Sequence, residues 1–199
     1  MKLKWLFLGI LLGLPVGIYL FLQGFGNNRF EVPVFYEKGI DTPIGSCQDS
    51  KSLFKVPTTI QLDHPILVDQ KKLTVFDVGT PNCDSCQFKI NNMVSVLDRF
   101  RNWEGLTVVS IVNGAEVGLY PDSKKDWQVH TSEDGKKVIN FANCVLNLEV
   151  SSIDDEVIKN GRVVLVDNQQ RIRGYYNVFD RKESDRLAVE IEILRQNMN

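Results

Sequence analysis

The sequence predicts an α/β protein, with a mixed sheet flanked by helices and preceded by one N-terminal transmembrane helix. Two observations predict this architecture. Short runs of β-branched and aromatic residues alternate with segments of helical periodicity, which is typical of a sheet covered on both faces. In addition, the run from Trp5 to Leu22 contains 18 residues without a single charge.

The uncharged run is long enough to cross a bilayer, because a helix rises about 1.5 Å per residue and would span about 27 Å. Lys2 and Lys4 precede the run and favour the cytoplasmic side, which places the rest of the chain outside the cytoplasm. A cleaved signal peptide is the alternative, but no small-residue cleavage site follows the run. We therefore predict that residues 1–4 are cytoplasmic and that residues 5–22 form an uncleaved signal anchor in the inner membrane. The domain that follows is expected to face the periplasm or extracytoplasmic side.

Residues 23–60 are predicted to form a tether, since they contain three prolines and no sustained periodicity. The remaining residues, 61–199, are enough for one domain and too few for two.

Composition excludes several classes of protein. The chain has 199 residues, 23 basic and 25 acidic, for a formal charge of −2. This balance provides no strongly basic surface, so we expect no nucleic-acid partner. Hydrophobic residues make up 43% of the sequence, which excludes a disordered chain. Four cysteines are too few for a disulfide-stapled miniprotein, so each is a candidate for chemistry.

Strands and helices are expected to alternate along the domain. The expected strands are residues 73–78, 106–112, 163–167 and 172–176, the last two joined by a turn at 168–170. The expected helices are residues 84–102, residues 135–148 and a C-terminal helix capped by Asp180. The order of strand, Cys-x-x-Cys motif, helix, strand, helix, strand hairpin and helix is that of the thioredoxin fold. The domain is therefore predicted to be thioredoxin-like.

The motif Cys83-Asp84-Ser85-Cys86 lies between a predicted strand and the first turn of a predicted helix. Unpaired N–H groups and the helix dipole stabilise a thiolate at that place, which makes it a nucleophile. Two intervening residues let the second sulfur reach the first, so a mixed disulfide can be resolved internally. We predict that Cys83 and Cys86 are the catalytic residues of thiol–disulfide exchange, with Cys83 as the attacking and Cys86 as the buried resolving cysteine.

Other interpretations of the cysteines and histidines stay open. The motif could be a static disulfide, whereas a zinc site would need a second close ligand pair, and Cys47 and Cys144 are isolated. Cys144 lies on the expected inward side of the 135–148 helix, which is typical of a buried cysteine, and a Cys47–Cys144 bond is one open pairing. Both histidines, His64 and His130, are expected to be surface side chains.

The C-terminal hairpin carries a family resemblance. The segment from Val163 to Tyr176 resembles the strand–turn–strand of the SCO/SenC family, membrane-anchored thioredoxin-fold proteins of cytochrome c oxidase copper assembly. Trp127 with the later turn Glu133-Asp134-Gly135, and the stretch 32–39, are similar to further family segments. The resemblance implies a respiratory assembly role, with the redox-active cysteines of an extracytoplasmic assembly protein as partner.

The sequence departs from the family at the metal site. The resemblance implies a metal site of two cysteines separated by three residues, with a histidine shortly before the hairpin. Here only two residues separate Cys83 from Cys86, and Lys159-Asn160-Gly161-Arg162 stands where that histidine would fall. Copper prefers soft thiolates with a further donor such as imidazole. Copper bound by Cys83 and Cys86, with His130 as substitute ligand, is therefore the alternative, and no cofactor is the first expectation.

Two further observations, a missing proline and a peroxidase-like pattern, concern the chemistry of the motif. No proline follows Pro121, so the chain lacks the cis-proline that thioredoxin-like oxidoreductases place against the motif. A peroxidase is a third interpretation, based on Thr80-Pro81-Asn82-Cys83, in which the cysteine is displaced by one residue from the usual pattern. The sequence thus predicts a thiol–disulfide exchange protein, with a copper-binding module or a non-catalytic assembly scaffold as the alternatives.

Overall fold

The computed structural model describes residues 2–25, 31–45, 47, 51–80, 86–114, 120–121, 126–155, 158 and 161–198. The chain forms two compact units, Met1–Glu31 and Val32–Asn199.

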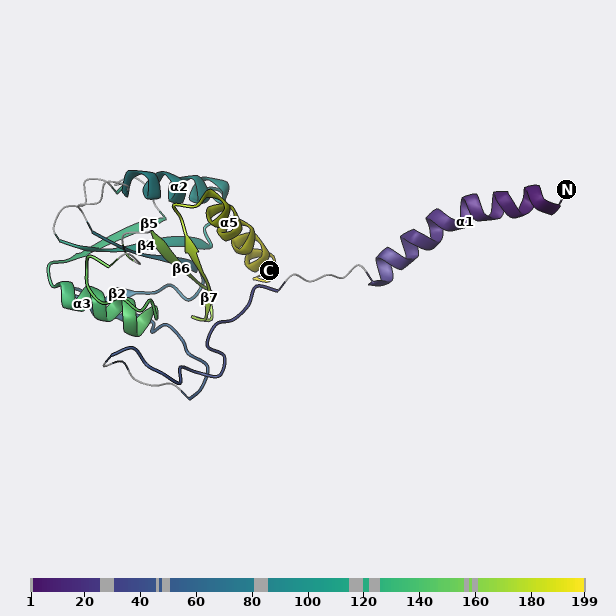
Figure 1. The fold of residues 1–199 in the computed structure, drawn as a ribbon. Helices are drawn as coiled ribbons and strands as arrows, with labels where there is room; N and C mark the ends of the chain where they lie inside the picture. Colours follow the sequence, from purple (N-terminus) through teal and green to yellow (C-terminus); the bar gives the residue numbers. More distant parts are fainter. Residues whose placement is uncertain are drawn as a thin grey trace. The chain divides into compact units, whose positions relative to one another are not determined.

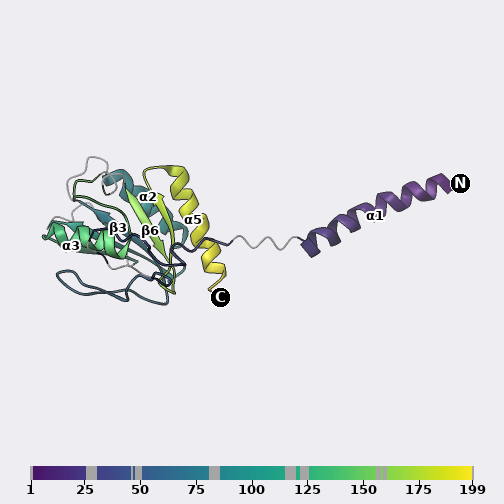
Figure 2. The same cartoon turned by 60° about the horizontal axis from the view of Figure 1, so that its bottom comes forward.

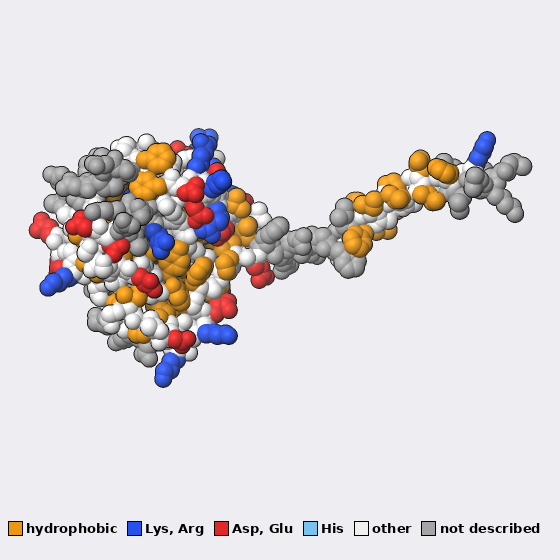
Figure 3. All heavy atoms as spheres, viewed as in Figure 1, with side chains coloured by type: hydrophobic (Ala, Val, Ile, Leu, Met, Phe, Trp, Pro, Cys, Tyr) orange, Lys and Arg blue, Asp and Glu red, His pale blue; other side chains and the backbone are white. Residues whose placement is uncertain are grey.

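The first unit contains helix α1, which covers Lys2–Phe25 and contains Pro15. Its large apolar side chains from Ile10 to Phe21 are exposed, and Figure 3 shows apolar side chains along the visible face of the helix. Within the described ranges, no helix combines the length and the apolar character needed to cross a membrane.

The second unit is built on a mixed five-stranded sheet with the strand order β5-β4-β3-β6-β7 (Figure 1). The strands are β3 (Leu73–Gly79), β4 (Leu106–Asn113), β5 (Trp127–Ser132), β6 (Arg162–Val166) and β7 (Ile172–Asn177). Strands β3, β4 and β5 are parallel neighbours, whereas β6 is antiparallel to both β3 and β7. Strands β1 (Thr59–Ile60) and β2 (Ile66–Leu67) form a separate antiparallel pair.

Helices cover both faces of this sheet (Figures 1 and 2). Helices α2 (Cys86–Arg99) and α5 (Arg181–Gln196) pack on one face, and the short helix α3 (Gly135–Asn140) with the π-helix η1 (Phe141–Val145) packs on the other. Successive side chains of a strand point to opposite faces, so each central strand supplies both cores. Leu73 and Val75 of β3 join the α2 and α5 core, whereas Phe76 and Val78 join the α3 and η1 core.

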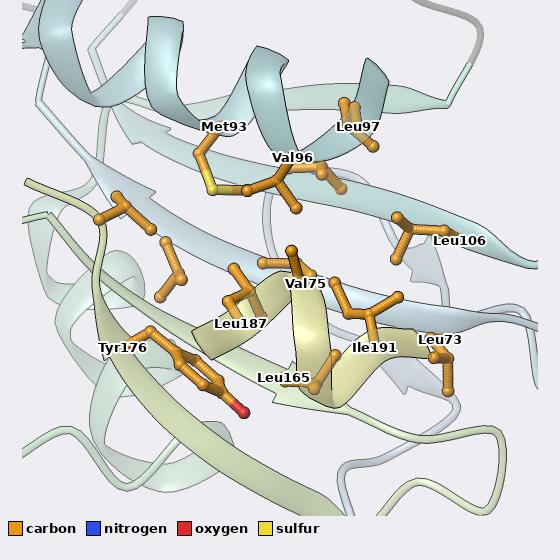
Figure 4. Packing of buried hydrophobic residues seen from close by; sticks show 14 of the residues in the cluster. Leu73, Val75, Met93, Val96, Leu97, Leu106, Leu165, Tyr176, Leu187 and Ile191 are labelled. Atoms are coloured by element: carbon orange, nitrogen blue, oxygen red, sulfur yellow. The ribbon is translucent and has the colours of Figure 1, made fainter. Parts of the chain in front are cut away.

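The core beneath α2 and α5 positions the start of α2. Figure 4 shows side chains of α2 and α5 meeting above the sheet, among them Met93 and Val96 from α2 and Leu187 and Ile191 from α5. All four are at most 3% exposed. This packing fixes the position of α2, which begins at Cys86, relative to β3, which ends at Gly79.

The predicted fold class is confirmed for the second unit, which has a thioredoxin-like sheet flanked by helices. All four expected strands are present, and the C-terminal helix begins after Asp180, whose carboxylate accepts a hydrogen bond from the Lys182 amide. Strand β5 was not predicted, because its sequence WQVHTS is largely polar. It lies at the edge of the sheet, where such residues face solvent.

The prediction of one continuous helix over residues 135–148 is wrong. The α-helix ends at Asn140 and a π-helix follows to Val145, in which the Leu146 amide bonds the Phe141 carbonyl at 3.3 Å. The wider turn keeps Phe141 in the core and leaves Cys144 half-buried, bonded to Cys47. The expectation of a buried Cys144 is therefore wrong as well, and the open pairing is resolved.

Much of the segment expected as a tether packs on the second unit. Val32, Ile40 and Val56 are at most 9% exposed. The Phe35 amide bonds the Ile172 carbonyl at 2.9 Å, and the Val56 amide bonds the Gln170 carbonyl at the same distance. These contacts place Phe35 beside the first residue of strand β7 and Val56 beside the turn that precedes it.

Candidate functional site

The described half of the Cys-x-x-Cys motif lies at the junction of β3 and α2. Cys83 itself lies outside the described residues. Cys86 is the first residue of α2, is 2% exposed and is held in a disulfide. Its Sγ lies 3.7 Å from the carbonyl oxygen of Thr80, the residue that follows β3. The resolving position of the motif is therefore shielded from solvent and next to the strand end.

A buried ion pair lies one helical turn from Cys86. The Lys89 ammonium of α2 contacts Asp77 Oδ1 of β3 at 2.8 Å, and the two side chains are 2% and 1% exposed. Removing two charges from water costs several kcal/mol per ion, so such a pair is seldom kept for stability alone. This pair is the principal charged feature of the described residues around the motif.

Hydrogen bonds extend from the ion pair across the sheet. Ser110 Oγ of β4 donates to Asp77 Oδ2 at 3.0 Å, and Trp127 Nε1 of β5 donates to Ser110 Oγ at 2.9 Å. Both oxygens of the carboxylate thus have a donor, which satisfies much of its hydrogen-bonding capacity in the interior. Because three strands and α2 contribute, the position of the Asp77 carboxylate is fixed from several sides.

Gly79 and Tyr120 pack against the same region. A Cβ atom at Gly79 would collide with the Tyr120 hydroxyl and lie 3.3 Å from Lys89 Nζ, so only glycine fits here without a shift. Tyr120 is 5% exposed, and its hydroxyl makes no hydrogen bond of ordinary geometry with the described residues. Burial is the main cause that raises the pKa of Tyr120, and the nearby Asp77 raises it further.

Stability should fall at high pH through Tyr120. Since the pKa is raised in the folded state, this stability is present below the unfolded pKa of about 10 and is lost as pH rises above it. We expect Tyr120→Phe to flatten the decline by up to about 1.4 kcal/mol per pH unit, the contribution of one proton. Urea unfolding from pH 8 to 11 measures this. Burial also raises the pKa values of Tyr175 and Tyr176, which are present in both the unchanged chain and the variant. The effect of Tyr120 is therefore the difference between their free energies of unfolding at each pH. Identical pH profiles would contradict the assignment.

An exposed aromatic pair lies beside the motif helix. Phe88 of α2 is 52% exposed and stacks on Phe179 with ring centroids 6.3 Å apart and planes within 2°. Gly161 adopts φ +65°, and a Cβ there would lie 2.7 Å from the Phe179 ring and 3.2 Å from Lys89 Cδ. The residue of the loop before β6 that approaches α2 is thus a glycine, Gly161. The cis-proline that thioredoxin-like oxidoreductases place against the motif is absent, since no proline follows Pro121.

The structure separates the other candidate residues from the motif. His130 lies half-buried on edge strand β5, where burial lowers its pKa. His64 is exposed, and so is Arg162, which shares the α3 face of β6 with Val164. No group of three His, Cys, Asp or Glu side chains among the described residues could hold a metal ion.

Sequence reasoning missed Asp77 and Lys89. A signal was present, because Lys89 stands three residues after Cys86 and four before Met93, the spacing of the buried face of α2. Asp77 likewise alternates with apolar residues on the α2 side of β3. A lysine and an aspartate at two inward positions of adjacent elements predict an ion pair.

Comparisons with known proteins identify the fold. No protein-family model matches the sequence, and no curated protein matches it. Among solved structures, this chain is similar to BsSco, which is described as a Sco family cytochrome c oxidase assembly protein with a disulfide switch. The TM-score is 0.57 and the sequence identity is 17%, and the match covers 72% of this chain and 95% of that chain.

Two further structures show the same likeness. A SCO1/SenC family lipoprotein from Bacillus anthracis str. Ames gives a TM-score of 0.54 at 13% identity, over 79% of this chain and 98% of that chain. A candidate thiol:disulfide interchange protein DsbE from Chlorobium tepidum gives a TM-score of 0.51 at 14% identity, over 72% of this chain and 99% of that chain. The expected resemblance to the SCO/SenC family is confirmed at the level of the fold.

Proposed function

We propose that this chain is a divergent Sco-type protein that exchanges thiols and disulfides through Cys83 and Cys86. The observation that carries the proposal is the buried, disulfide-bonded Cys86 at the start of α2, one turn from a buried ion pair. Cys47 and Cys144 are bonded to one another, so Cys83 is the remaining cysteine of the sequence. The proposed partner is an extracytoplasmic respiratory assembly protein whose cysteines the dithiol keeps reduced.

The proposed reaction has two steps. The Cys83 thiolate attacks a partner disulfide, which forms a mixed disulfide and releases one partner thiolate. The Cys86 thiolate then attacks the Cys83 sulfur, which forms the Cys83–Cys86 disulfide and releases the second partner thiolate. Two electrons pass from the dithiol to the partner, and a separate dithiol donor must restore the reduced pair.

Lys89 and Asp77 would assist the second step. In the reduced protein the Cys86 thiol has the Thr80 carbonyl at 3.7 Å as an acceptor for its proton. The Lys89 ammonium lies 3.3 Å from the Cβ position of Gly79, the residue before Thr80. We propose that this ammonium, although Asp77 at 2.8 Å partly neutralises it, favours the thiolate form of Cys86 when that sulfur attacks.

We further propose that the N-terminal helix anchors the chain in the inner membrane with the second unit outside the cytoplasm. The support is the 18-residue uncharged run of the sequence, the two lysines that precede it and the helical conformation of Lys2–Phe25. Fractionation of cells expressing the full chain tests this, and recovery in the soluble cytoplasmic fraction would contradict it.

The exchange proposal is tested with single serine variants of the full chain. We expect Cys86→Ser to form a stable mixed disulfide with a peptide that contains an internal disulfide, because the resolving sulfur is missing. Cys83→Ser should form none, since Cys86 is buried. Non-reducing electrophoresis and peptide mass mapping detect the product.

Each serine variant is the matched control of the other. Equal trapping by both variants, or exchange by Cys83→Ser at the rate of the unchanged chain, would contradict the assigned roles. After reduction, Cys83 should also react with an alkylating reagent before Cys86 does, and a protected Cys83 would exclude the mechanism.

Copper binding remains the alternative function. The names of BsSco and the Bacillus anthracis lipoprotein place those proteins in the Sco family, but no group of three His, Cys, Asp or Glu side chains among the described residues of this chain could hold a metal ion. We therefore derive no step through copper. Titration of the reduced chain with copper(I) separates the functions: tight stoichiometric binding that Cys83→Ser abolishes would favour a copper carrier. The absence of both copper binding and exchange would favour a scaffold.

A further inference from the structure

The disulfide between Cys47 and Cys144 borders a surface pocket. The pocket has a volume of about 480 Å³, and its lining includes Cys47, Gly45, Lys136, Lys137, Ile139 and Asn140. This volume is in the range of small-molecule sites. The pocket adjoins α3 and η1, on the opposite face of the sheet from α2 and Cys86.

The pocket distinguishes the two sulfur-bearing residues. Cys47 is part of its lining, whereas Cys144 is not among the described residues that line it. Both cysteines are half-buried, so the bond is not sealed in the core. A thiol that enters the pocket therefore meets Cys47 first, with Cys144 as the leaving group.

The charge of the pocket favours an anionic ligand. Lys136 and Lys137 both line it, and Lys137 Nζ pairs with Asp63 Oδ1 at 2.5 Å. That contact partly neutralises Lys137, so Lys136 supplies much of the positive field. Lysines attract carboxylates, and Asn140 adds an amide that can bind a polar ligand.

We propose that this pocket is a second thiol-exchange site, which takes a low-molecular-weight thiol that carries carboxylates. The ligand thiolate attacks Cys47 Sγ and forms a new S–S bond with it. The Cys47–Cys144 bond breaks, its electron pair remains on Cys144 Sγ, and that sulfur takes a proton from water. One thiol is consumed and one is formed, so no external oxidant or reductant is needed.

The surroundings of Cys144 suit the thiol that is produced. Asn140 Oδ1 lies 3.1 Å from Cys144 Sγ, so the new thiol gains a hydrogen-bond acceptor that the disulfide, without a proton, cannot use. Cys144 belongs to the π-helix η1, a type of turn that is frequent at functional sites. Reclosure expels the ligand when Cys144 attacks Cys47, so the open form must be trapped to be observed.

The test uses the full chain with reduced glutathione as the anionic thiol and cysteamine as a cationic thiol. A slow alkylating reagent is present, so that each exposed thiol is trapped, and peptides are mapped by mass spectrometry. We expect glutathione attached to Cys47 and the alkyl group attached to Cys144. After correction for thiolate fraction, glutathione should react about fivefold faster than cysteamine because of the lysines.

Two lysine variants test the role of charge. Lys136→Gln should lower the preference for glutathione to about half or less, whereas the matched change Lys182→Gln on α5 should leave it unaltered. Three outcomes would overturn the proposal: attachment to Cys144 in place of Cys47, no product unless the chain is denatured, and equal corrected rates for the two thiols. Adducts at Cys83 or Cys86 map to separate peptides, so modification of Cys47 and Cys144 can be measured even if no exchange occurs at Cys83 and Cys86.

Discussion

Asp77→Ala is expected to destabilise the folded second unit by about 3–5 kcal/mol, because it leaves the Lys89 ammonium buried without its partner. The two side chains are 1% and 2% exposed, so water cannot readily replace the lost carboxylate. Ser110, which donates to Asp77 at 3.0 Å, also loses its acceptor. Equilibrium urea unfolding measures the change in the free energy of unfolding.

A paired variant separates an unpaired charge from lost packing. In Asp77→Val with Lys89→Met both charges are removed and the volume is largely kept, so most of the stability should return. A residual loss of about 1–3 kcal/mol is expected from the Ser110 hydroxyl, which remains without an acceptor. If the single and paired variants are equally destabilised, the ion pair is not the cause.

The paired variant also tests the proposed assistance to Cys86. It should fold and form the mixed disulfide at Cys83, but resolve it more slowly at neutral pH, since the cation that favours the Cys86 thiolate is missing. Raising the pH should restore the rate, because more of the Cys86 thiol then ionises. A purely structural ion pair would leave the pH dependence of resolution unchanged.

Removing the Cys47–Cys144 disulfide is expected to cost about 2–5 kcal/mol. The two cysteines are 97 residues apart, so the bond closes a long loop in the unfolded chain. A chain-entropy model gives about 4.7 kcal/mol for a loop of about 100 residues. The bond also holds the segment before β1 against η1, on the face where Phe141 packs.

The measurement compares the unchanged chain with the double variant Cys47→Ser and Cys144→Ser in urea without a reducing agent. Leaving out the reductant keeps the disulfide of Cys86 intact, so only one bond differs. A loss below about 1 kcal/mol would show that the bond constrains the unfolded chain little.

The central strands were the most predictable part of the fold. Segments 73–78 and 163–166 are rich in β-branched residues and buried on both faces, so the local pattern and the position in the sheet agree. Strand β5 was not predictable because its sequence at the sheet edge is largely polar. The π-helix at Phe141 depends on packing against the sheet, and the spacing of apolar residues in the sequence does not encode it.

The candidate site was only partly predictable for a related reason. The motif spacing and its place before a helix are local, so Cys83 and Cys86 could be proposed from the sequence. Asp77 and Lys89 are 12 residues apart and become partners only when β3 and α2 pack together. The pairing of Cys47 with Cys144 depends in the same way on where the segment before β1 meets η1.

The backbone bonds of Phe35 and Val56 at the start of β7 have a consequence for strand pairing between molecules. A bare outer strand offers unpaired amides and carbonyls to a strand of another molecule and so promotes aggregation. Here the Ile172 and Gln170 carbonyls are already bonded to Phe35 and Val56 of the same chain. Phe35 and Val56 therefore occupy two carbonyls at the start of β7 and in the turn before it, and we expect a shortened chain that begins after residue 56 to expose both to another molecule.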